Sequence, residues 1–141
     1  MQTADLMEMI RKDIMISLIR EVTREDGRVV FAYLYGSFVK EESFRDIDVG
    51  VYLMDAGENS IVVSAELKTK LSRGAQRHSF NFTADQFDVK ILNDAPFTFL
   101  RRVFEQGILL FDQNPELRTD VIEYVSLKYR ECAGILAEAS L

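Results

Sequence analysis

The sequence predicts an α+β domain in which a mixed sheet of about four β-strands is packed with helices in two layers. The prediction rests on helical periodicity at both ends of the chain and on short β-branched or alternating runs between them. The 141 residues are 48% hydrophobic and 28% charged, which is typical of one folded domain. We therefore expect a single domain over residues 1–141.

The first elements are a long helix and a buried strand. Apolar residues recur every four positions over residues 3–24, as on one face of a helix. Residues 29–35 form an aromatic and β-branched run without polar alternation, which is typical of a central strand covered on both faces. Gly36 and Ser37 end this strand, and a short helix is expected over residues 38–42.

The later elements follow from turn residues and shorter patterns. They are a strand over 46–53, a helix over 61–72 capped by Ser60, a strand over 87–91, a helix from Pro96 to Gln106 stopped by Gly107, a strand over 108–111, and a last helix over 115–139 capped by Asn114. Residues 73–83 show no clear period and carry no prediction. On the last helix we expect an apolar face, including Tyr124, Cys132 and Ile135, to be packed in the core; a surface for a partner is the alternative.

Composition and charge exclude several classes of protein. With 17 basic and 23 acidic residues the net charge is −6, which disfavours direct binding of DNA or RNA. An acidic chain can still bind a polyphosphate when a metal ion lies between the carboxylates of the protein and the phosphates. The longest uncharged stretch, residues 29–39, is too short to span a membrane, and no secretory pattern is visible. The single cysteine fits a reducing environment, so we expect a cytoplasmic location.

Asp46 and Asp48 are candidate metal ligands. Residues two apart on a strand point to the same face, so the two carboxylates are expected side by side, opposite the apolar side chains of the same strand. Two such carboxylates repel each other unless a cation compensates them, and oxygen-only ligation suits Mg²⁺ or Mn²⁺. The alternative is a solvated strand face without function.

Gly36 and Ser37 form a candidate phosphate-binding turn. A glycine after a buried strand lets the backbone approach a ligand closely, and a helix beginning at Phe38 would offer its N-terminus to an anion. An ordinary strand-to-helix turn is the alternative. Together, an anion-binding turn and a carboxylate pair on neighbouring strands indicate a site for a nucleoside triphosphate.

Four sequence blocks resemble a known protein family. These are Leu34–Lys40, Asp46–Val51, Phe87–Pro96 and Phe99–Phe111, which occur in the family's order. The resemblance as a whole extends over most of the chain. Gly-Ser, a short helix and Asp-x-Asp are similar to the signature of the polymerase-β-type nucleotidyltransferase superfamily. Within it, the chain resembles the minimal nucleotidyltransferases (MNT), encoded beside HEPN-domain toxins.

The resemblance implies a role for each candidate residue. Asp46, Asp48 and Asp88 would hold two Mg²⁺ ions, with Asp88 also helping to deprotonate the attacking hydroxyl. Asp88 lies beside Lys90 on the polar face of its predicted strand. The alternative interpretation of Asp88 is a carboxylate that only faces solvent. Gly36 and Ser37 would position the β- and γ-phosphates of ATP. Lys40 would add positive charge, with a solvated lysine as the alternative.

The resemblance also implies an activity and a partner. The expected reaction is transfer of AMP from ATP to a tyrosine hydroxyl of a HEPN ribonuclease toxin, with this protein as its antitoxin. The chain is too small for a separate acceptor-binding domain, which favours an acceptor presented by a partner protein.

Two alternatives stay open. Glu41 stands where the family usually has glycine, Arg45 where it has serine, and the intervening loop is short. These departures motivate an antitoxin of weak activity that neutralises its toxin by binding alone. The other alternative is a homodimeric nucleotidyltransferase acting on a small molecule.

Overall fold

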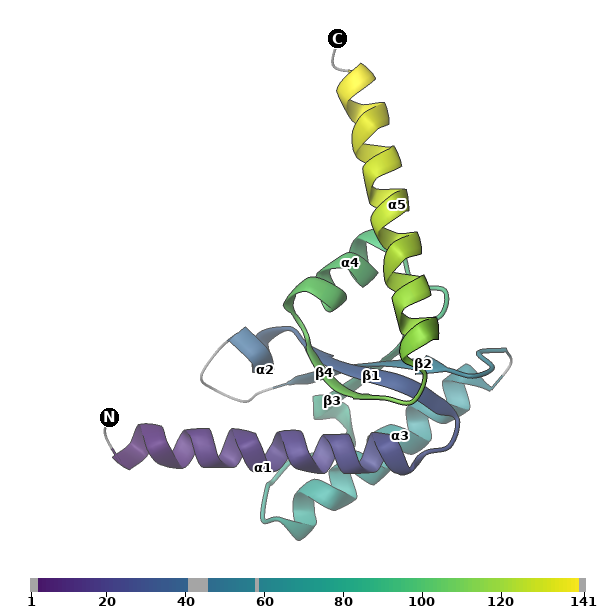
Figure 1. Cartoon of the computed structure of the whole chain (residues 1–141). Helices are drawn as coiled ribbons and strands as arrows, with labels where there is room; N and C mark the ends of the chain where they lie inside the picture. Colours follow the sequence, from purple (N-terminus) through teal and green to yellow (C-terminus); the bar gives the residue numbers. More distant parts are fainter. Residues whose placement is uncertain (1–2, 41–45, 58, 140–141) are drawn as a thin grey trace.

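A computed structural model describes residues 3–40, 46–57 and 59–139 of the chain, and the side chains up to residue 135 (Figure 1). Its elements in order are α1 (Thr3–Glu25), β1 (Val29–Tyr35), α2 (Ser37–Lys40), β2 (Ile47–Leu53), α3 (Ser60–Arg77), a 3₁₀ turn (Ala84–Gln86), β3 (Phe87–Ile91), α4 (Phe97–Gln106), β4 (Ile108–Asp112) and α5 (Pro115–Ala139). The predicted α+β class and its mixed four-stranded sheet are confirmed.

The sheet has the strand order β3-β2-β1-β4. Strand β1 pairs antiparallel with both β2 and β4, whereas β2 and β3 run parallel. All but the last residue of β1 is buried, as its unbroken apolar run predicts for a central strand. The parallel pair needs a crossover connection, which α3 supplies.

Helices cover both faces of the sheet (Figure 1). On one face, α1 and α3 bury Met15, Ile19 and Leu67 against the apolar side of β1 and β2. On the other face, α4 and α5 contribute Leu100, Val103 and Val125 to a second cluster that includes Phe31. The molecule therefore has three layers rather than the two that we expected. The reason is that the central strands carry apolar side chains on both faces, one toward α1 and α3 and the other toward α4 and α5.

Several predicted boundaries differ from the structure, by one residue except at the end of α3. Helix α3 continues to Arg77, into the segment that carried no prediction. Its N-cap is Asn59 rather than Ser60, which is the first helical residue. Pro96 is likewise the N-cap of α4 and not its first helical residue. Strand β2 begins at Ile47, so Asp46 directly precedes the strand instead of lying within it.

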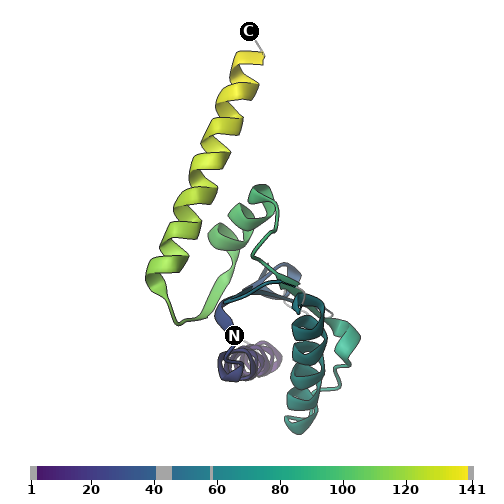
Figure 2. The same cartoon turned by 90° about the vertical axis from the view of Figure 1, so that its right-hand side faces the viewer.

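Helix α5 begins as predicted, with the Asn114 side chain accepting a hydrogen bond from the Leu117 backbone N–H at 3.1 Å. Arg118 anchors this first part by bonding to Asp112 at 2.6 Å and to the Tyr33 hydroxyl at 2.9 Å. Further along, the helix leaves the body of the molecule (Figure 2). The expectation of a packed apolar face is therefore wrong for Tyr124, Ile135 and Cys132, which are exposed.

No helix in the described part of the chain is both long and apolar enough to cross a membrane.

Candidate functional site

Three side chains of the predicted site region form a row across the sheet. Tyr35, the last residue of β1, lies opposite Asp48 of β2, and Asp48 lies opposite Asp88 of β3. Directly paired residues on neighbouring strands point to the same face of a sheet. The intervening apolar residues of β2, such as Ile47 and Val49, are buried on the opposite face among α1 and α3. The row therefore stands on the side of the sheet that α4 and α5 cover.

Asp48 and Asp88 are brought together by the parallel pairing of their strands, in which they are direct partners. Burial raises the pKa of Asp48, and the negative charges of Asp88 and Asp46 raise it further. Lys90 opposes this effect, and its Nζ lies 4.0 Å from Asp88 Oδ2. The carboxylate pair is thus an electrostatically unfavourable arrangement that a bound cation would relieve.

Gly36 places the turn after β1 against Asp48. Its φ of 79° lies in the left-handed region that side chains disfavour. A Cβ added to Gly36 would collide with the Asp48 carboxylate oxygen. Both the conformation and the close approach require glycine, so the chain backbone at this turn is held directly beside the carboxylate pair.

Helix α2 is a single turn that begins at Ser37, one residue before the predicted start. The backbone N–H groups of Val39 and Lys40 donate to the Gly36 carbonyl at 3.2 and 3.3 Å. The buried Phe38 side chain fixes this turn to the core. Such a short helix carries little dipole, so Ser37 can contribute mainly its hydroxyl and backbone N–H to a phosphate. Lys40 lies exposed at the end of the turn.

Lys12 supports the turn from the other helix layer and was not predicted. Its Nζ donates to the Phe38 carbonyl oxygen at 3.1 Å and lies 5.5 Å from the centroid of the Phe38 ring. This contact links α1 to α2 across 26 residues of sequence. A helical lysine gives no signal of this role in the sequence, because the contact exists only in the fold.

Asp46 is exposed and lies just outside the strand that carries Asp48. Within the described ranges, no group of three or more His, Cys, Asp or Glu side chains is arranged to hold a metal ion by itself. Two carboxylates are nevertheless enough for Mg²⁺, which commonly takes its other ligands from substrate phosphates and water. Glu41 and Arg45, the departures from the family pattern, lie outside the described residues.

Tyr35 is the member of the row that sequence reasoning missed as a site residue. Its hydroxyl oxygen is buried and finds no hydrogen-bond partner among the described residues. The ring packs edge-on against Phe99 of α4, with centroids 5.4 Å apart. Burial and the charges of Asp48 and Asp88 raise the Tyr35 pKa far above its ordinary value, so the hydroxyl stays a donor. The only signal in the sequence that Tyr35 belongs to the site is its position directly before Gly36.

A comparison with protein families matches residues 17–116 to the model described as polymerase beta, nucleotidyltransferase. The match includes Tyr35, Asp48 and Asp88. A comparison with curated proteins gives no match.

Solved structures with a similar fold include complexes of toxins and antitoxins. One, a toxin–antitoxin with AMP-PNP, is 20% identical, with a TM-score of 0.62 over 89% of this chain and 98% of that one. A second is the toxin–antitoxin MntA–HepT, 19% identical, with a TM-score of 0.60 over 92% and 99% of the two chains. A third is a tri-AMPylated Shewanella oneidensis HEPN toxin in complex with MNT antitoxin, 20% identical, with a TM-score of 0.56 over 95% and 99%. At these identities the likeness establishes the fold.

Proposed function

Because the chain belongs to the polymerase beta nucleotidyltransferase family, we propose that it transfers AMP from ATP to a tyrosine hydroxyl of a HEPN-type toxin and so acts as its antitoxin. The observation that carries this proposal is the row of Tyr35, Asp48 and Asp88 beside the Gly36 turn. Two carboxylates next to a backbone turn that approaches a ligand closely suit a metal-bound triphosphate.

The choice of AMP and of the acceptor is supported by the structural neighbours. One neighbour carries AMP-PNP, and another is a complex of an MNT antitoxin with a HEPN toxin that bears three AMP groups. The sequence motifs of this chain resemble the same group of proteins. Their fold is shared over nearly the whole chain, which makes the same chemistry the simplest reading of this site.

Asp48 and Asp88, together with Asp46, would hold two Mg²⁺ ions. The donors are oxygen atoms only, and Asp48 and Asp88 stand at directly paired positions of neighbouring strands, so the residues present fit this ion. When bound, Mg²⁺ neutralises charge on the triphosphate and lowers the pKa of the attacking hydroxyl. Mn²⁺ has the same ligand preference and is expected to substitute.

The remaining residues bind and orient the substrate. Gly36 and Ser37 present backbone and hydroxyl groups to the β- and γ-phosphates, and Lys40 adds a positive charge at the end of the turn. Asp88 accepts the proton of the acceptor hydroxyl. The hydroxyl oxygen forms a bond to the α-phosphorus, the bond from that phosphorus to the β-phosphate oxygen breaks, and pyrophosphate leaves.

The test mixes the purified protein with labelled ATP, Mg²⁺ and the purified product of the neighbouring gene. We expect label on that protein, at a tyrosine located by mass spectrometry. The double variant Asp46→Asn, Asp48→Asn should lower transfer by at least about 100-fold, because an amide cannot supply the negative charge that the ion needs.

The matched control is Asp55→Asn, Asp85→Asn, which makes the same chemical change at two exposed aspartates outside the site. This control should transfer label at the wild-type rate. Absence of transfer by the wild type, or equal transfer by the Asp46 and Asp48 variant, would contradict the proposal.

A second function, neutralisation of the toxin by binding alone, is favoured by one observation. Glu41 and Arg45 stand where the family usually has glycine and serine, and the loop before Asp46 is short, as would suit a chain of weak activity. In cells, the Asp46→Asn, Asp48→Asn variant would then protect against the toxin as well as the wild type does. Loss of protection in this variant would exclude the binding-only function.

A further inference from the structure

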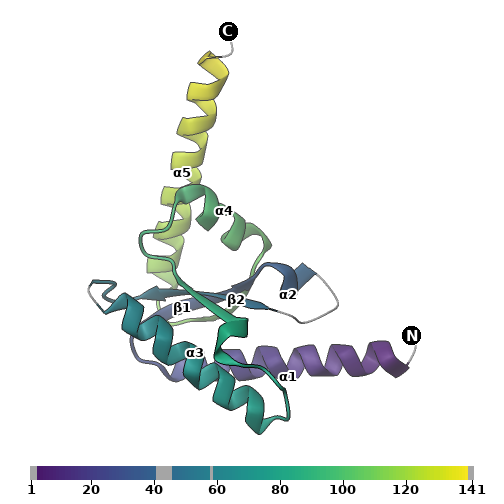
Figure 3. The same ribbon diagram turned by 180° about the vertical axis from the view of Figure 1, so that it is seen from behind.

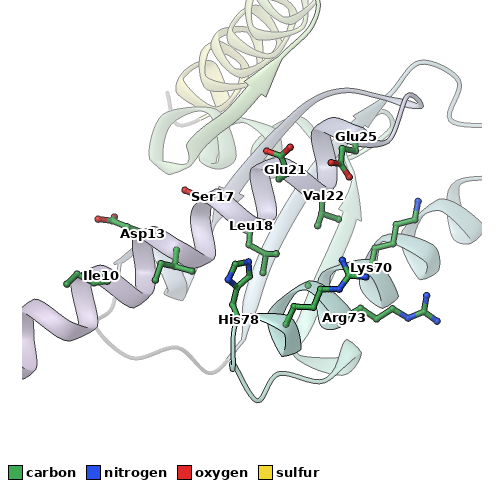
Figure 4. Close-up of a pocket in the computed structure, with 13 residues that line it drawn as sticks. Ile10, Asp13, Ser17, Leu18, Glu21, Val22, Glu25, Lys70, Arg73 and His78 are labelled. Carbon is green, nitrogen blue, oxygen red and sulfur yellow. The ribbon is translucent and has the colours of Figure 1, made fainter.

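A groove lies between α1 and α3 (Figure 4). These two helices cover the face of the sheet opposite the carboxylate row. Its volume is about 910 Å³. Apolar side chains of α1 form the floor, including Ile10, Ile14 and Leu18. The two helices touch where Gly74 of α3 meets Leu18, since a Cβ on Gly74 would lie 2.6 Å from Leu18 Cδ1. The groove is therefore shallow, apolar at its base and open to solvent.

The two rims of the groove carry opposite charges. Helix α1 contributes Asp13, Glu21 and Glu25, whereas α3 contributes Lys70 and Arg73 (Figure 4). Arg77 of α3 also lines the groove. Among the described residues no ion pair joins one rim to the other; Glu21 pairs along its own helix with Arg24. Each rim is thus available to charges that an occupant would bring.

The apolar floor continues beyond the part that α3 backs. The first turns of α1 extend past the body of the molecule (Figure 3). There Leu6 continues the four-residue spacing of Ile10, Ile14 and Leu18. Leu6 is 50% exposed and Ile10 is 45% exposed. A continuous stripe of this length matches the apolar face of a helix of several turns.

The concave shape selects the kind of occupant. A single helix is convex and can lie along the apolar floor between the two charged rims. Its apolar stripe would need basic residues on the flank facing α1 and acidic residues on the flank facing α3. We propose that the groove docks such an amphipathic helix, and that the helix belongs to the toxin partner. The identity of the partner rests on the proposed function; the groove and its charges do not.

This docking would place the partner near the nucleotide site without blocking it. The exposed N-terminal half of α1 lies at the same end of the molecule as α2 (Figure 1). Lys12 of that half bonds directly to the Phe38 carbonyl of α2. A partner helix bound along α1 would therefore lie close to the α2 turn. The nucleotide site, on the other face of the sheet, would stay open for ATP to bind and pyrophosphate to leave.

The test measures binding of the neighbouring gene's product to two groove variants. Arg73→Glu with Arg77→Glu reverses the α3 rim, and Ile14→Asp places a charge in the floor; all three side chains are exposed, so the fold should hold. Each variant should weaken binding by at least about tenfold, and the rim variant more strongly at low salt. Thermal unfolding confirms that each variant is folded.

The matched control is Arg102→Glu with Arg130→Glu, which changes the net charge equally on exposed positions of α4 and α5. It should bind as the wild type does. Unchanged binding by the groove variants, or equal weakening by the control, would overturn the proposal. The Asp46→Asn, Asp48→Asn variant should bind normally but transfer no label, so a failed groove and a failed nucleotide site give different results. If the wild type does not bind this protein, both the partner and the docking proposal are wrong.

A photo-crosslinking side chain at Ser17, inside the groove, identifies the occupant directly. Its control position is Gln76, which is exposed on α3 outside the groove. A crosslink from position 17 to a helix of the partner would support the proposal. A crosslink to a second copy of this chain, or to the partner from position 76 alone, would contradict it.

Discussion

Gly36 adopts a φ of 79° directly before α2, with Asp48 against its α-carbon. Replacing it by alanine should cost about 2 kcal/mol of the free energy of unfolding, because the backbone is strained and the new Cβ meets a carboxylate. The same change should abolish nucleotide transfer, since either the turn or Asp48 must move. Chemical denaturation and the labelled-ATP assay measure the two effects.

The control is Gly27→Ala in the turn between α1 and β1. A Cβ at Gly27 would have nothing within 4 Å. This variant should change the free energy of unfolding by less than about 1 kcal/mol and leave transfer unchanged. Equal effects of the two substitutions would mean that Gly36 has no special place in the site.

At the scale of elements, Asp26 ties the end of α1 to the start of β1. Its buried carboxylate accepts two hydrogen bonds from the Arg28 guanidinium, at 2.9 and 2.7 Å, and one from the Arg28 backbone N–H at 3.1 Å. The side-chain bonds from Arg28 outweigh burial and hold the pKa of Asp26 below its ordinary value. The ionised form of this residue therefore stabilises the junction.

The pH dependence follows from the direction of this shift. Because the folded pKa lies below the unfolded one, the stabilisation is fully present above the unfolded value of about 4 and is lost as pH falls through the folded value. Asp26→Asn should lower the free energy of unfolding by about 2 kcal/mol at pH 7 and by much less at about pH 3. Urea unfolding at both pH values tests this, with exposed Asp85→Asn as the control. A difference that does not depend on pH would contradict the assignment.

Helix α5 illustrates how one element divides into a packed part and a projecting part. Val125 is 2% exposed within the cluster formed with α4, and Arg101 of α4 lies 3.6 Å from the centroid of the Tyr129 ring. Beyond this point the described side chains, residues 130–135, are all exposed.

Truncation after Arg130 should therefore leave the free energy of unfolding within about 0.5 kcal/mol of the wild-type value. Val125→Ala, by contrast, should lower it by about 2 kcal/mol because it opens a cavity in the second cluster. Thermal and denaturant unfolding compare the two variants. A truncated chain that is destabilised as much as Val125→Ala would show that the outer turns pack against the body.

At the scale of the whole molecule, the sheet separates the candidate nucleotide site from the proposed docking groove. The carboxylate row faces α4 and α5, whereas the groove lies on the outer side of α1 and α3. Lys12 is the direct hydrogen-bonded link from α1 to the turn beside the row. This separation explains why nucleotide transfer and partner docking can be tested by different substitutions.

Local patterns in the sequence were sufficient for the order of elements and for most of the candidate site. The apolar run of residues 29–35 identifies the central strand, and alternation identifies β3. Gly36 and Asp48 stand next to turn and strand signals that do not depend on distant residues. Such features are readable because the period of side chains along a strand or helix is set by the backbone alone.

Only the tertiary structure decided what lies beside what. The row of Tyr35, Asp48 and Asp88 depends on the register of three strands, and the third layer depends on which faces the helices cover. The exposure of Tyr124 and Ile135 reverses the expectation of a buried face, because an amphipathic pattern does not specify what covers it. Family resemblance and local pattern thus determined the fold class and named the candidate site residues, whereas contacts between residues far apart in sequence determined the geometry of that site and the groove between α1 and α3.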